Sequence, residues 1–226
     1  MEGSYSGRSA SGNLLAGIPQ RKFHHRSRFG SCGIPTKHHS LSFVPCTGPL
    51  GKICVMTQNI ILIGFMGCGK SSIGRRLAGR LGYELRDSDD LITARAGKSI
   101  TDIFNDEGEA RFRERETMEL RELIDSQGIV LATGGGAVLR EENREILRRI
   151  GLVVWLHSDP ETLFERANRN RKRPLLDVEN PRGTFNALLE SRLQVYEAAA
   201  DRKVDATGLS HDQTVEALLS AIGAQS

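Results

Sequence analysis

The sequence predicts a three-layer α/β domain in which helices cover a five-stranded parallel sheet. From Asn59 onward, short apolar runs alternate with longer amphipathic stretches, which is the pattern of strands joined by crossover helices. The composition is that of a globular protein, with 38% hydrophobic and 26% charged residues. A length of 226 residues accommodates one ordinary domain and an appended segment.

The strands are predicted from short runs between turn signals. The first and third runs are uninterrupted apolar segments and are expected to be buried. In chain order, the expected strands are residues 60–63, 83–86, 129–132, 152–156 and 203–205.

The helices are predicted from the longer amphipathic stretches between these strands. Asp159-Pro160-Glu161 opens one helix with a capping residue, a proline and an early acid. Ser210-His211-Asp212-Gln213 resembles a capping box before the final helix. Gly108 is expected to separate one or two helical turns from a longer helix. The other expected helical segments are residues 70–81, 89–96, 101–106, 109–126, 141–149 and 184–200.

A basic excursion interrupts this alternation at about residues 168–183. It has no apolar period and contains prolines, so we expect a mobile segment. Three interpretations stay open: a solvated loop, a nucleic-acid patch, or a lid that closes over a triphosphate and excludes water. Four basic residues are clustered near its start: Arg169, Arg171, Lys172 and Arg173.

Residues 1–55 form a basic extension that is expected to be disordered, because they show no sustained period. They hold seven Lys and Arg against one acid, whereas the rest of the chain holds 24 basic and 27 acidic residues. A plastid or mitochondrial targeting peptide, a nucleic-acid-binding arm and a misplaced start upstream of Met56 all fit this pattern. We favour the third, since Met56 lies three residues before the first strand.

The cysteine distribution and the hydropathy bear on location. Only Cys68 lies beyond the first segment, so the domain has no internal disulfide, which fits a reducing compartment. No window approaches roughly eighteen uncharged apolar residues, so a membrane-spanning helix is not expected.

A phosphate-binding loop is the most specific motif in the chain. Residues 64–71, Gly-Phe-Met-Gly-Cys-Gly-Lys-Ser, match G-x-x-x-x-G-K-[ST] at every fixed position, between an expected strand and an expected helix. Glycines let backbone N–H groups turn inward, Lys70 meets the outer phosphates, and the Ser71 hydroxyl binds Mg²⁺. A glycine-rich turn without this role is the disfavoured alternative. The expected nucleotide-binding residues here are Gly67, Cys68, Gly69, Lys70, Ser71 and Ser72.

Two acids close the second strand, at Asp87 and Asp89. In an extended segment, side chains two residues apart share a face, so both are expected at the carboxyl edge of the sheet, where ligands bind. One acid would order a magnesium-bound water, and the other would accept a hydroxyl hydrogen bond or proton. An ordinary helix N-cap pair is the alternative.

Arginines and glycines supply the other candidate contacts. Arg113 and Glu116 are three apart on a helix, so the acid can hold the guanidinium for a substrate anion; a solvated surface pair is the alternative. Thr133-Gly134-Gly135-Gly136 permits a close backbone approach, or is a loose turn. Arg192 is a further anion contact or a surface residue.

Together these motifs resemble the shikimate kinases of bacterial type, a P-loop family related to nucleoside monophosphate kinases. The resemblance runs from about Asn59 to the C-terminus. It implies the strand order 2-3-1-4-5, a mobile lid, and transfer of the ATP γ-phosphoryl group to the 3-hydroxyl of shikimate. The motifs that carry it are residues 64–71, Asp87-x-Asp89, Phe112-Arg113-x-x-Glu116, residues 133–136, Arg173-Pro174-Leu175-Leu176, and Arg192 with Tyr196.

The resemblance also implies a role for each matching residue. Asp89 would bind the substrate hydroxyls and act as the base, Arg113 and Arg192 would grip the carboxylate, and Gly135 would contact the substrate through its backbone. Lys70 and Arg173 would neutralise the transferring phosphoryl group, and Arg166 would lie against adenine. Ser71, with Asp87 through water, would hold Mg²⁺.

Three alternatives to this function remain: a related small-molecule kinase such as gluconate kinase, a non-catalytic ATP-binding paralogue, and a nucleic-acid-binding protein. We expect a monomer that binds neither nucleic acid nor membranes. Its expected location is the cytoplasm, or the plastid if residues 1–55 are a targeting peptide.

Overall fold

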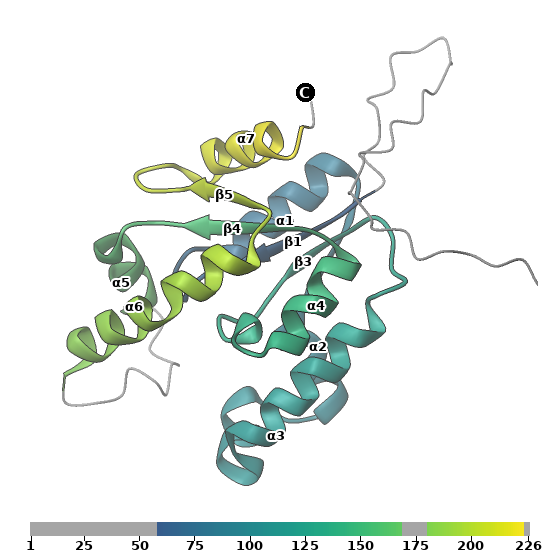
Figure 1. Cartoon of the computed structure of the whole chain (residues 1–226), viewed down its shortest axis with the longest axis vertical. Coiled ribbons are helices and arrows are strands. Elements are labelled where there is room, and N and C mark those ends of the chain that lie inside the picture. Colours follow the sequence, from purple (N-terminus) through teal and green to yellow (C-terminus); the bar gives the residue numbers. More distant parts are fainter. Residues whose placement is uncertain (1–57, 169–179, 224–226) are drawn as a thin grey trace, which may run out of the picture. The chain divides into compact units, whose positions relative to one another are not determined.

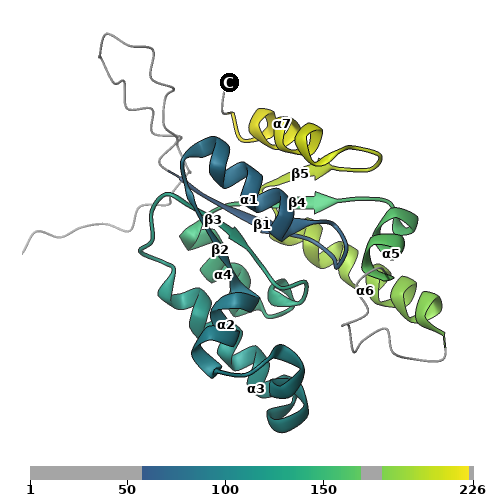
Figure 2. The ribbon, with the colours of Figure 1, turned by 180° about the vertical axis from the view of Figure 1, so that it is seen from behind.

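A computed structural model of the chain describes residues 58–168 and 180–223, which belong to one compact unit. The expectations for residues 1–55 and for Arg173 lie outside these residues, as does most of the mobile segment or lid expected at about 168–183. The described part has a central sheet with helices on both faces (Figures 1 and 2).

Five parallel strands form the sheet in the order β2-β3-β1-β4-β5, which confirms the expected topology. Every residue of β1 is buried, and Ile61 is in register with Leu131 on one side and Val153 on the other. The chain order reverses at β1, and such switch points place ligands at the carboxyl ends of the strands. The strands are β1 (Asn59–Ile63), β2 (Glu84–Asp87), β3 (Ile129–Ala132), β4 (Gly151–His157) and β5 (Arg202–Asp205).

Helices pack on both faces of this sheet. Helices α1 and α7 contact each other on one face, and α4 and α6 contact β4 on the other (Figures 1 and 2). Helices α2 and α3 pack together with a small apolar cluster of their own. The helices are α1 (Lys70–Leu81), α2 (Ser88–Ala96), α3 (Ile100–Glu122), α4 (Glu141–Ile150), α5 (Pro160–Asn168), α6 (Pro181–Ala199) and α7 (His211–Ala221), and a short helix η1 covers Ala137–Leu139.

Two helix boundaries differ from expectation. Helix α6 begins at Pro181 and not at residue 184: the Asn180 side chain accepts a hydrogen bond from the Gly183 N–H, and proline occupies the first turn. The expected separation at Gly108 is present, since this glycine has the non-helical angles φ 80° and ψ 169°, but α3 ends at Glu122 and not at residue 126. The capping box that begins at Ser210 is present as expected.

A buried asparagine fixes the amino-terminal end of β1. The Asn59 amide donates to the carbonyl oxygens of Ser126 at 2.6 Å and Ile150 at 2.9 Å, and its Oδ1 accepts from the Ile129 N–H at 3.1 Å. This one side chain therefore ties together the starts of three neighbouring strands, at the edge of the sheet opposite the phosphate-binding loop.

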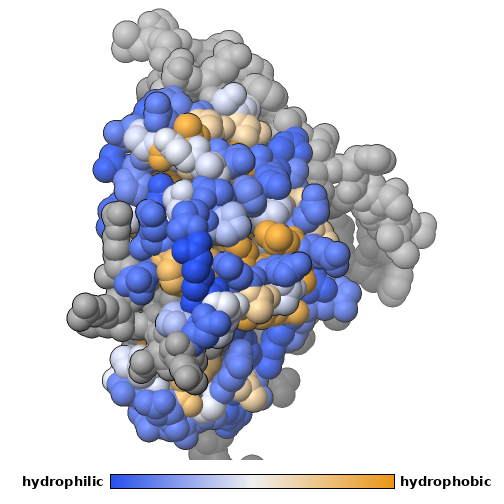
Figure 3. All heavy atoms as spheres, turned by 90° about the vertical axis from the view of Figure 1, so that its left-hand side faces the viewer, coloured by the Kyte–Doolittle hydropathy of each residue, from blue (hydrophilic) through white to orange (hydrophobic). Residues whose placement is uncertain are grey.

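The surface in Figure 3 is mostly hydrophilic, and its apolar areas are small and separated. Among the described residues, Met118 and Leu139 are the large apolar side chains that are exposed. No helix within residues 58–168 and 180–223 is long and apolar enough to cross a membrane.

Candidate active site

The phosphate-binding loop connects β1 to α1 and depends on glycine for two reasons. Gly64, Gly67 and Gly69 have φ values of 146°, 88° and 89°, which other residues rarely adopt. A Cβ at Gly64 would also lie 2.5 Å from the Leu156 carbonyl oxygen, and one at Gly67 would press on the backbone of α5. The loop is thus both curved as a phosphate nest requires and packed tightly against β4 and α5.

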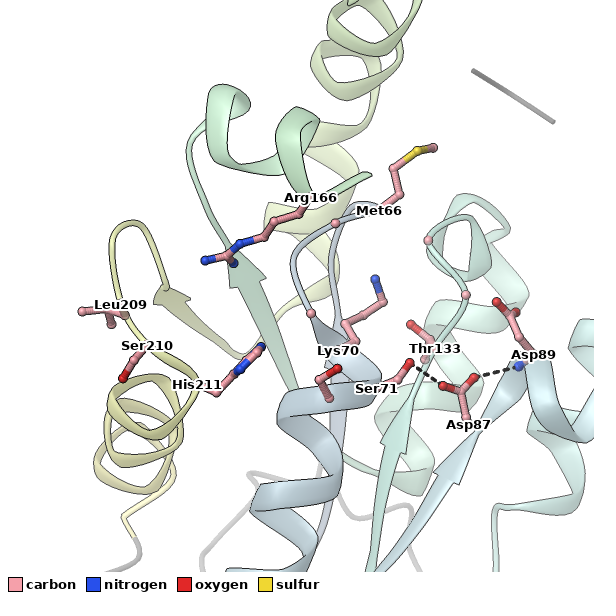
Figure 4. A pocket seen from close by; sticks show the side chains of 15 residues that line it. Met66, Lys70, Ser71, Asp87, Asp89, Thr133, Arg166, Leu209, Ser210 and His211 are labelled. Carbon is pink, nitrogen blue, oxygen red and sulfur yellow. Dashed lines mark hydrogen bonds between the residues drawn. The ribbon is translucent and has the colours of Figure 1, made fainter. Parts of the chain in front are cut away.

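Lys70 lies over this loop and is held by it. Its ammonium donates to the carbonyl oxygens of Gly64 at 2.7 Å and Phe65 at 3.1 Å, and lies 3.5 Å from the Cys68 sulfur (Figure 4). The Cys68 side chain is fully buried, so only the backbone of this residue is available to a ligand.

Asp87 links the loop to α2. Its Oδ2 accepts a hydrogen bond from the Ser71 hydroxyl at 2.6 Å, and its Oδ1 accepts from the Asp89 N–H at 3.1 Å (Figure 4). The expectation that both acids lie in an extended segment is wrong, because Asp87 is the N-cap of α2 and Asp89 lies in its first turn. A carboxylate at the end of a strand favours this arrangement, since it satisfies the free N–H groups that begin the helix.

One cavity of about 610 Å³ at the carboxyl edge of the sheet brings many of the predicted residues together, but Cys68, Arg113 and Arg192 do not line it (Figure 4). Arg166 of α5 and the start of α7 flank the loop, while Asp87 and Asp89 lie on its other side. Sequence reasoning missed Leu209 and His211 here and treated Ser210 only as a cap. Their position directly after β5, at the ligand-binding edge, was the available signal. The predicted residues that line the cavity are Gly67, Gly69, Lys70, Ser71, Ser72, Asp87, Asp89, Gly135 and Arg166.

Arg113 and Glu116 form a buried ion pair. The Arg113 Nη1 lies 3.0 Å from the Glu116 Oε2, and its Nη2 lies 3.1 Å from Glu109. The Arg113 side chain is 13% exposed and that of Glu116 is 0% exposed, so the interpretation as a solvated surface pair is wrong. The guanidinium is held rigidly, as recognition of an anion requires.

The carboxyl group of this pair and that of the neighbouring Asp89 both have raised pKa values. Burial raises the pKa of Glu116 to about 7, assisted by the charge of Asp89 and opposed by Arg113. Burial, with the charge of Asp87, also raises the pKa of Asp89, and Lys70 and Arg113 oppose that shift. One oxygen of each, Glu116 Oε1 and Asp89 Oδ1, is buried without a hydrogen-bond partner among the described residues. Asp89 lines the cavity and can offer this oxygen to a ligand, whereas Glu116 does not line it.

The loop of Gly134, Gly135 and Gly136 lies against these charged groups. A Cβ at Gly134 would lie 2.8 Å from Asp89 Oδ1 and 2.9 Å from Glu116 Oε1, and one at Gly136 would overlap the Arg113 guanidinium. The close backbone approach is thus present, and a loose turn is excluded. The Gly134 N–H also donates to the Ser88 hydroxyl at 2.8 Å, a contact that the sequence did not reveal.

Arg192 and Tyr196 reach the same loop from α6. The Tyr196 hydroxyl donates to the Gly135 carbonyl oxygen at 2.5 Å, and the Arg192 Nη1 lies 3.4 Å from that oxygen. Arg192 is 8% exposed and stacks over the Phe65 ring, so it is not a surface residue. Both candidate arginines therefore lie beside one glycine loop, next to the phosphate-binding loop.

Comparisons of sequence and of structure with known proteins indicate the same family. A sequence model of the shikimate kinase family matches residues 66–223. A shikimate kinase of Bordetella avium is 42% identical over 196 residues, covering 86% of this chain and 93% of that protein. One of Actinobacillus pleuropneumoniae is 52% identical over 144 residues, or 64% of this chain and 83% of that protein.

A similar solved structure is the shikimate kinase of Acinetobacter baumannii in complex with shikimate. It superposes with a TM-score of 0.70 at 40% identity, covering 75% of this chain and 95% of that one. The shikimate kinase of Bacteroides thetaiotaomicron gives a TM-score of 0.67 at 30% identity, covering 74% and 99%.

Proposed function

The chain belongs to the shikimate kinase family, and from this membership we propose how its own residues carry the reaction. The protein is an ATP-dependent kinase that phosphorylates the 3-hydroxyl of shikimate, giving shikimate 3-phosphate and ADP in the route to aromatic amino acids. The assignment of residues rests on one observation: the partly buried Arg113, the buried Arg192 and the partly buried Asp89 surround one glycine loop, beside the phosphate-binding loop.

Arg113 and Arg192 bind the carboxylate of shikimate. Arg113 is fixed by Glu116, and Arg192 lies over Phe65 with its Nη1 near Gly135. A neutral sugar would leave the buried Arg192, which has no ion-pair partner among the described residues, without an anion, and that loss disfavours acceptors that lack a carboxylate. Gly135 contributes its backbone N–H, since its carbonyl is occupied by Tyr196.

Asp89 is the group that receives the acceptor hydroxyl. Its Oδ1 is buried, lacks a partner among the described residues, and lines the same cavity as Lys70. A carboxylate here accepts the hydroxyl hydrogen bond and then the proton as the oxygen attacks phosphorus. Its raised pKa brings it closer to the pH at which such a base works well.

The phosphate side uses Lys70 and two oxygen donors. A triphosphate in the loop would draw the Lys70 ammonium away from the Gly64 and Phe65 carbonyl oxygens to which it is bonded. Ser71 and Asp87 present oxygens 2.6 Å apart, and such hard donors suit Mg²⁺, which needs few protein ligands when phosphates and water complete its shell. Bound Mg²⁺ neutralises charge on the β- and γ-phosphates.

Arg166 and Arg173 complete the nucleotide site in this proposal. Arg166 lines the cavity on the same side of the phosphate-binding loop as His211, and would lie against adenine. Arg173 would offset charge on the transferring group from the segment that follows α5. A monomer in the cytoplasm, or in the plastid if residues 1–55 target it there, stays a prediction, as does the absence of nucleic-acid and membrane partners.

Release of ADP by the purified full-length chain with ATP and Mg²⁺ tests the function, with shikimate or gluconate as acceptor. We expect turnover with shikimate alone. Turnover with gluconate instead would replace this function with that of a related kinase, and ATP binding without turnover would indicate a non-catalytic paralogue.

The same assay tests the carboxylate contact. Arg113→Ala should raise the KM for shikimate by about 30-fold or more, which corresponds to the roughly 2–5 kcal/mol of breaking a buried charge pair. Arg111→Ala is the matched control, because Arg111 is 68% exposed on the same helix. An unchanged KM in Arg113→Ala would remove Arg113 from the acceptor site.

A further inference from the structure

One backbone carbonyl in the acceptor site has two donors of unequal strength. The Tyr196 hydroxyl lies 2.5 Å from the Gly135 oxygen, whereas the Arg192 Nη1 lies 3.4 Å from it, at the limit of a hydrogen bond. The phenol is therefore the stronger of the two donors to this carbonyl. The guanidinium is correspondingly only weakly committed to it.

The two donors come from adjacent turns of one helix. Arg192 and Tyr196 are four residues apart on α6, so their side chains project on the same face toward the glycine loop. Tyr196 is 1% exposed, and its ring stacks on Trp155 of β4 with the ring centroids 5.9 Å apart. Burial also raises its pKa well above the ordinary value, so the hydroxyl remains a donor at neutral pH.

A hydrogen bond to this carbonyl also fixes the peptide that follows. In a trans peptide, the C=O and N–H groups point in opposite directions, so holding the Gly135 oxygen toward α6 directs the Gly136 N–H away from it. A glycine-rich segment has little intrinsic preference for one orientation. The loop consequently takes its orientation from Tyr196 on one side and from Ser88, through the Gly134 N–H, on the other.

We propose that Tyr196 is a positioning residue for the acceptor: its hydroxyl occupies the Gly135 carbonyl and so leaves Arg192 free for the substrate carboxylate. The inference rests on the proposed role of Arg192. Without the phenol oxygen, the buried carbonyl retains Arg192 as its remaining donor. The guanidinium then turns toward the loop, and the carboxylate must compete with the carbonyl for it.

Steady-state kinetics of the full chain test this with Tyr196→Phe, which removes one oxygen and keeps the ring on Trp155. We expect the KM for shikimate to rise about tenfold while the KM for ATP stays within twofold. Tyr83→Phe is the matched control, because that hydroxyl is buried without a partner among the described residues and Tyr83 lies just before β2. A wild-type KM for shikimate in Tyr196→Phe would overturn the proposal.

A double-mutant cycle separates action through Arg192 from a general loss of packing. In the Arg192→Ala background, Tyr196→Phe should change the KM for shikimate by less than twofold, because the guanidinium it protects is gone. Multiplying effects would show that Tyr196 acts independently, and the proposal would fail. Arg192→Gln serves as the background if Arg192→Ala does not fold.

The same cycle distinguishes failure of this inference from failure of the residue assignment beneath it. If Arg192→Ala leaves the KM for shikimate unchanged, the assignment of Arg192 is wrong and the inference falls with it. If Arg192→Ala raises the KM and Tyr196→Phe does not, only the inference fails. Trp155, the single tryptophan, gives a binding readout without turnover, since shikimate titrations by fluorescence should show the same loss of affinity in Tyr196→Phe.

Discussion

Gly136→Ala is the sharpest perturbation of the acceptor site, because it adds one methyl group and leaves every charged group in place. The backbone at Gly136 has φ −105° and ψ −2°, which alanine adopts without strain. The new Cβ, however, would lie 2.6 Å from the Nη1 and 2.7 Å from the Cζ of Arg113. The added atom therefore acts on the guanidinium and not on the fold of the loop.

The size of the effect follows from these distances. An ordinary contact begins at 3.4 Å, so the Cζ must retreat by about 0.7 Å from its present 2.7 Å. The hydrogen bond from Nη1 to Glu116 is now 3.0 Å long, and a shift of that size stretches it beyond hydrogen-bonding range. We expect the lower end of the cost of disturbing a buried charge pair, about 2 kcal/mol, or roughly a 30-fold rise in the KM for shikimate.

The assay is ADP release at saturating ATP with shikimate varied, together with thermal unfolding. Gly79→Ala is the control: Gly79 lies within α1, and a Cβ there meets nothing within 4 Å, so the change should leave the KM unaltered and raise the unfolding free energy by about 0.5–1 kcal/mol. If Gly136→Ala binds shikimate as tightly as the wild type does, the reasoning is refuted. Either Arg113 is not the carboxylate ligand, or its guanidinium can move further than its contacts in the structure allow.

Three further changes address the base, the buried acid and the sheet. Asp89→Asn should abolish turnover while calorimetry shows ATP binding nearly intact; a normal rate would exclude Asp89 as the base. The raised pKa of Glu116 means that its contribution to the free energy of unfolding is complete below about pH 4.5 and is lost as the pH rises through about 7. The unfolding free energy of Glu116→Gln should therefore gain roughly 3 kcal/mol relative to the wild type over that range, and a constant difference would contradict the shift. Asn59→Ala should lower the free energy of unfolding by about 3 kcal/mol through its three lost hydrogen bonds and leave both KM values unchanged, which denaturant titration and kinetics would check.

The sheet could be predicted closely because its signals are local. The run Ile60–Ile63 is apolar without interruption, and its strand differs from expectation only by the addition of Asn59. Helix α1 has its expected bounds, since the phosphate-binding loop fixes its start and Gly82 its end. The prediction for Asp89 was only partly right. Alternation along a strand placed its side chain in the cavity, but Asp89 lies in the first turn of α2.

The burial of the arginines could not be predicted, because it depends on elements distant in the sequence. Arg113 lies on a helix rich in Glu and Arg, and nothing local distinguishes it from its exposed neighbour Arg111. Its environment is created by the glycine loop more than twenty residues later. The contacts of Ser88 and Tyr196 with that loop are of the same kind, since each joins side chain to backbone across the fold.

The packing of the phosphate-binding loop limits what its sequence motif indicates about activity. Gly64 and Gly67 are required by Leu156 and by the backbone of α5, quite apart from any nucleotide. A descendant that had lost its catalytic role would still need both glycines in order to fold. In relatives of this chain, the glycine pattern therefore indicates the fold. The residues at the positions of Lys70, Asp89 and Arg113 are better indicators of activity.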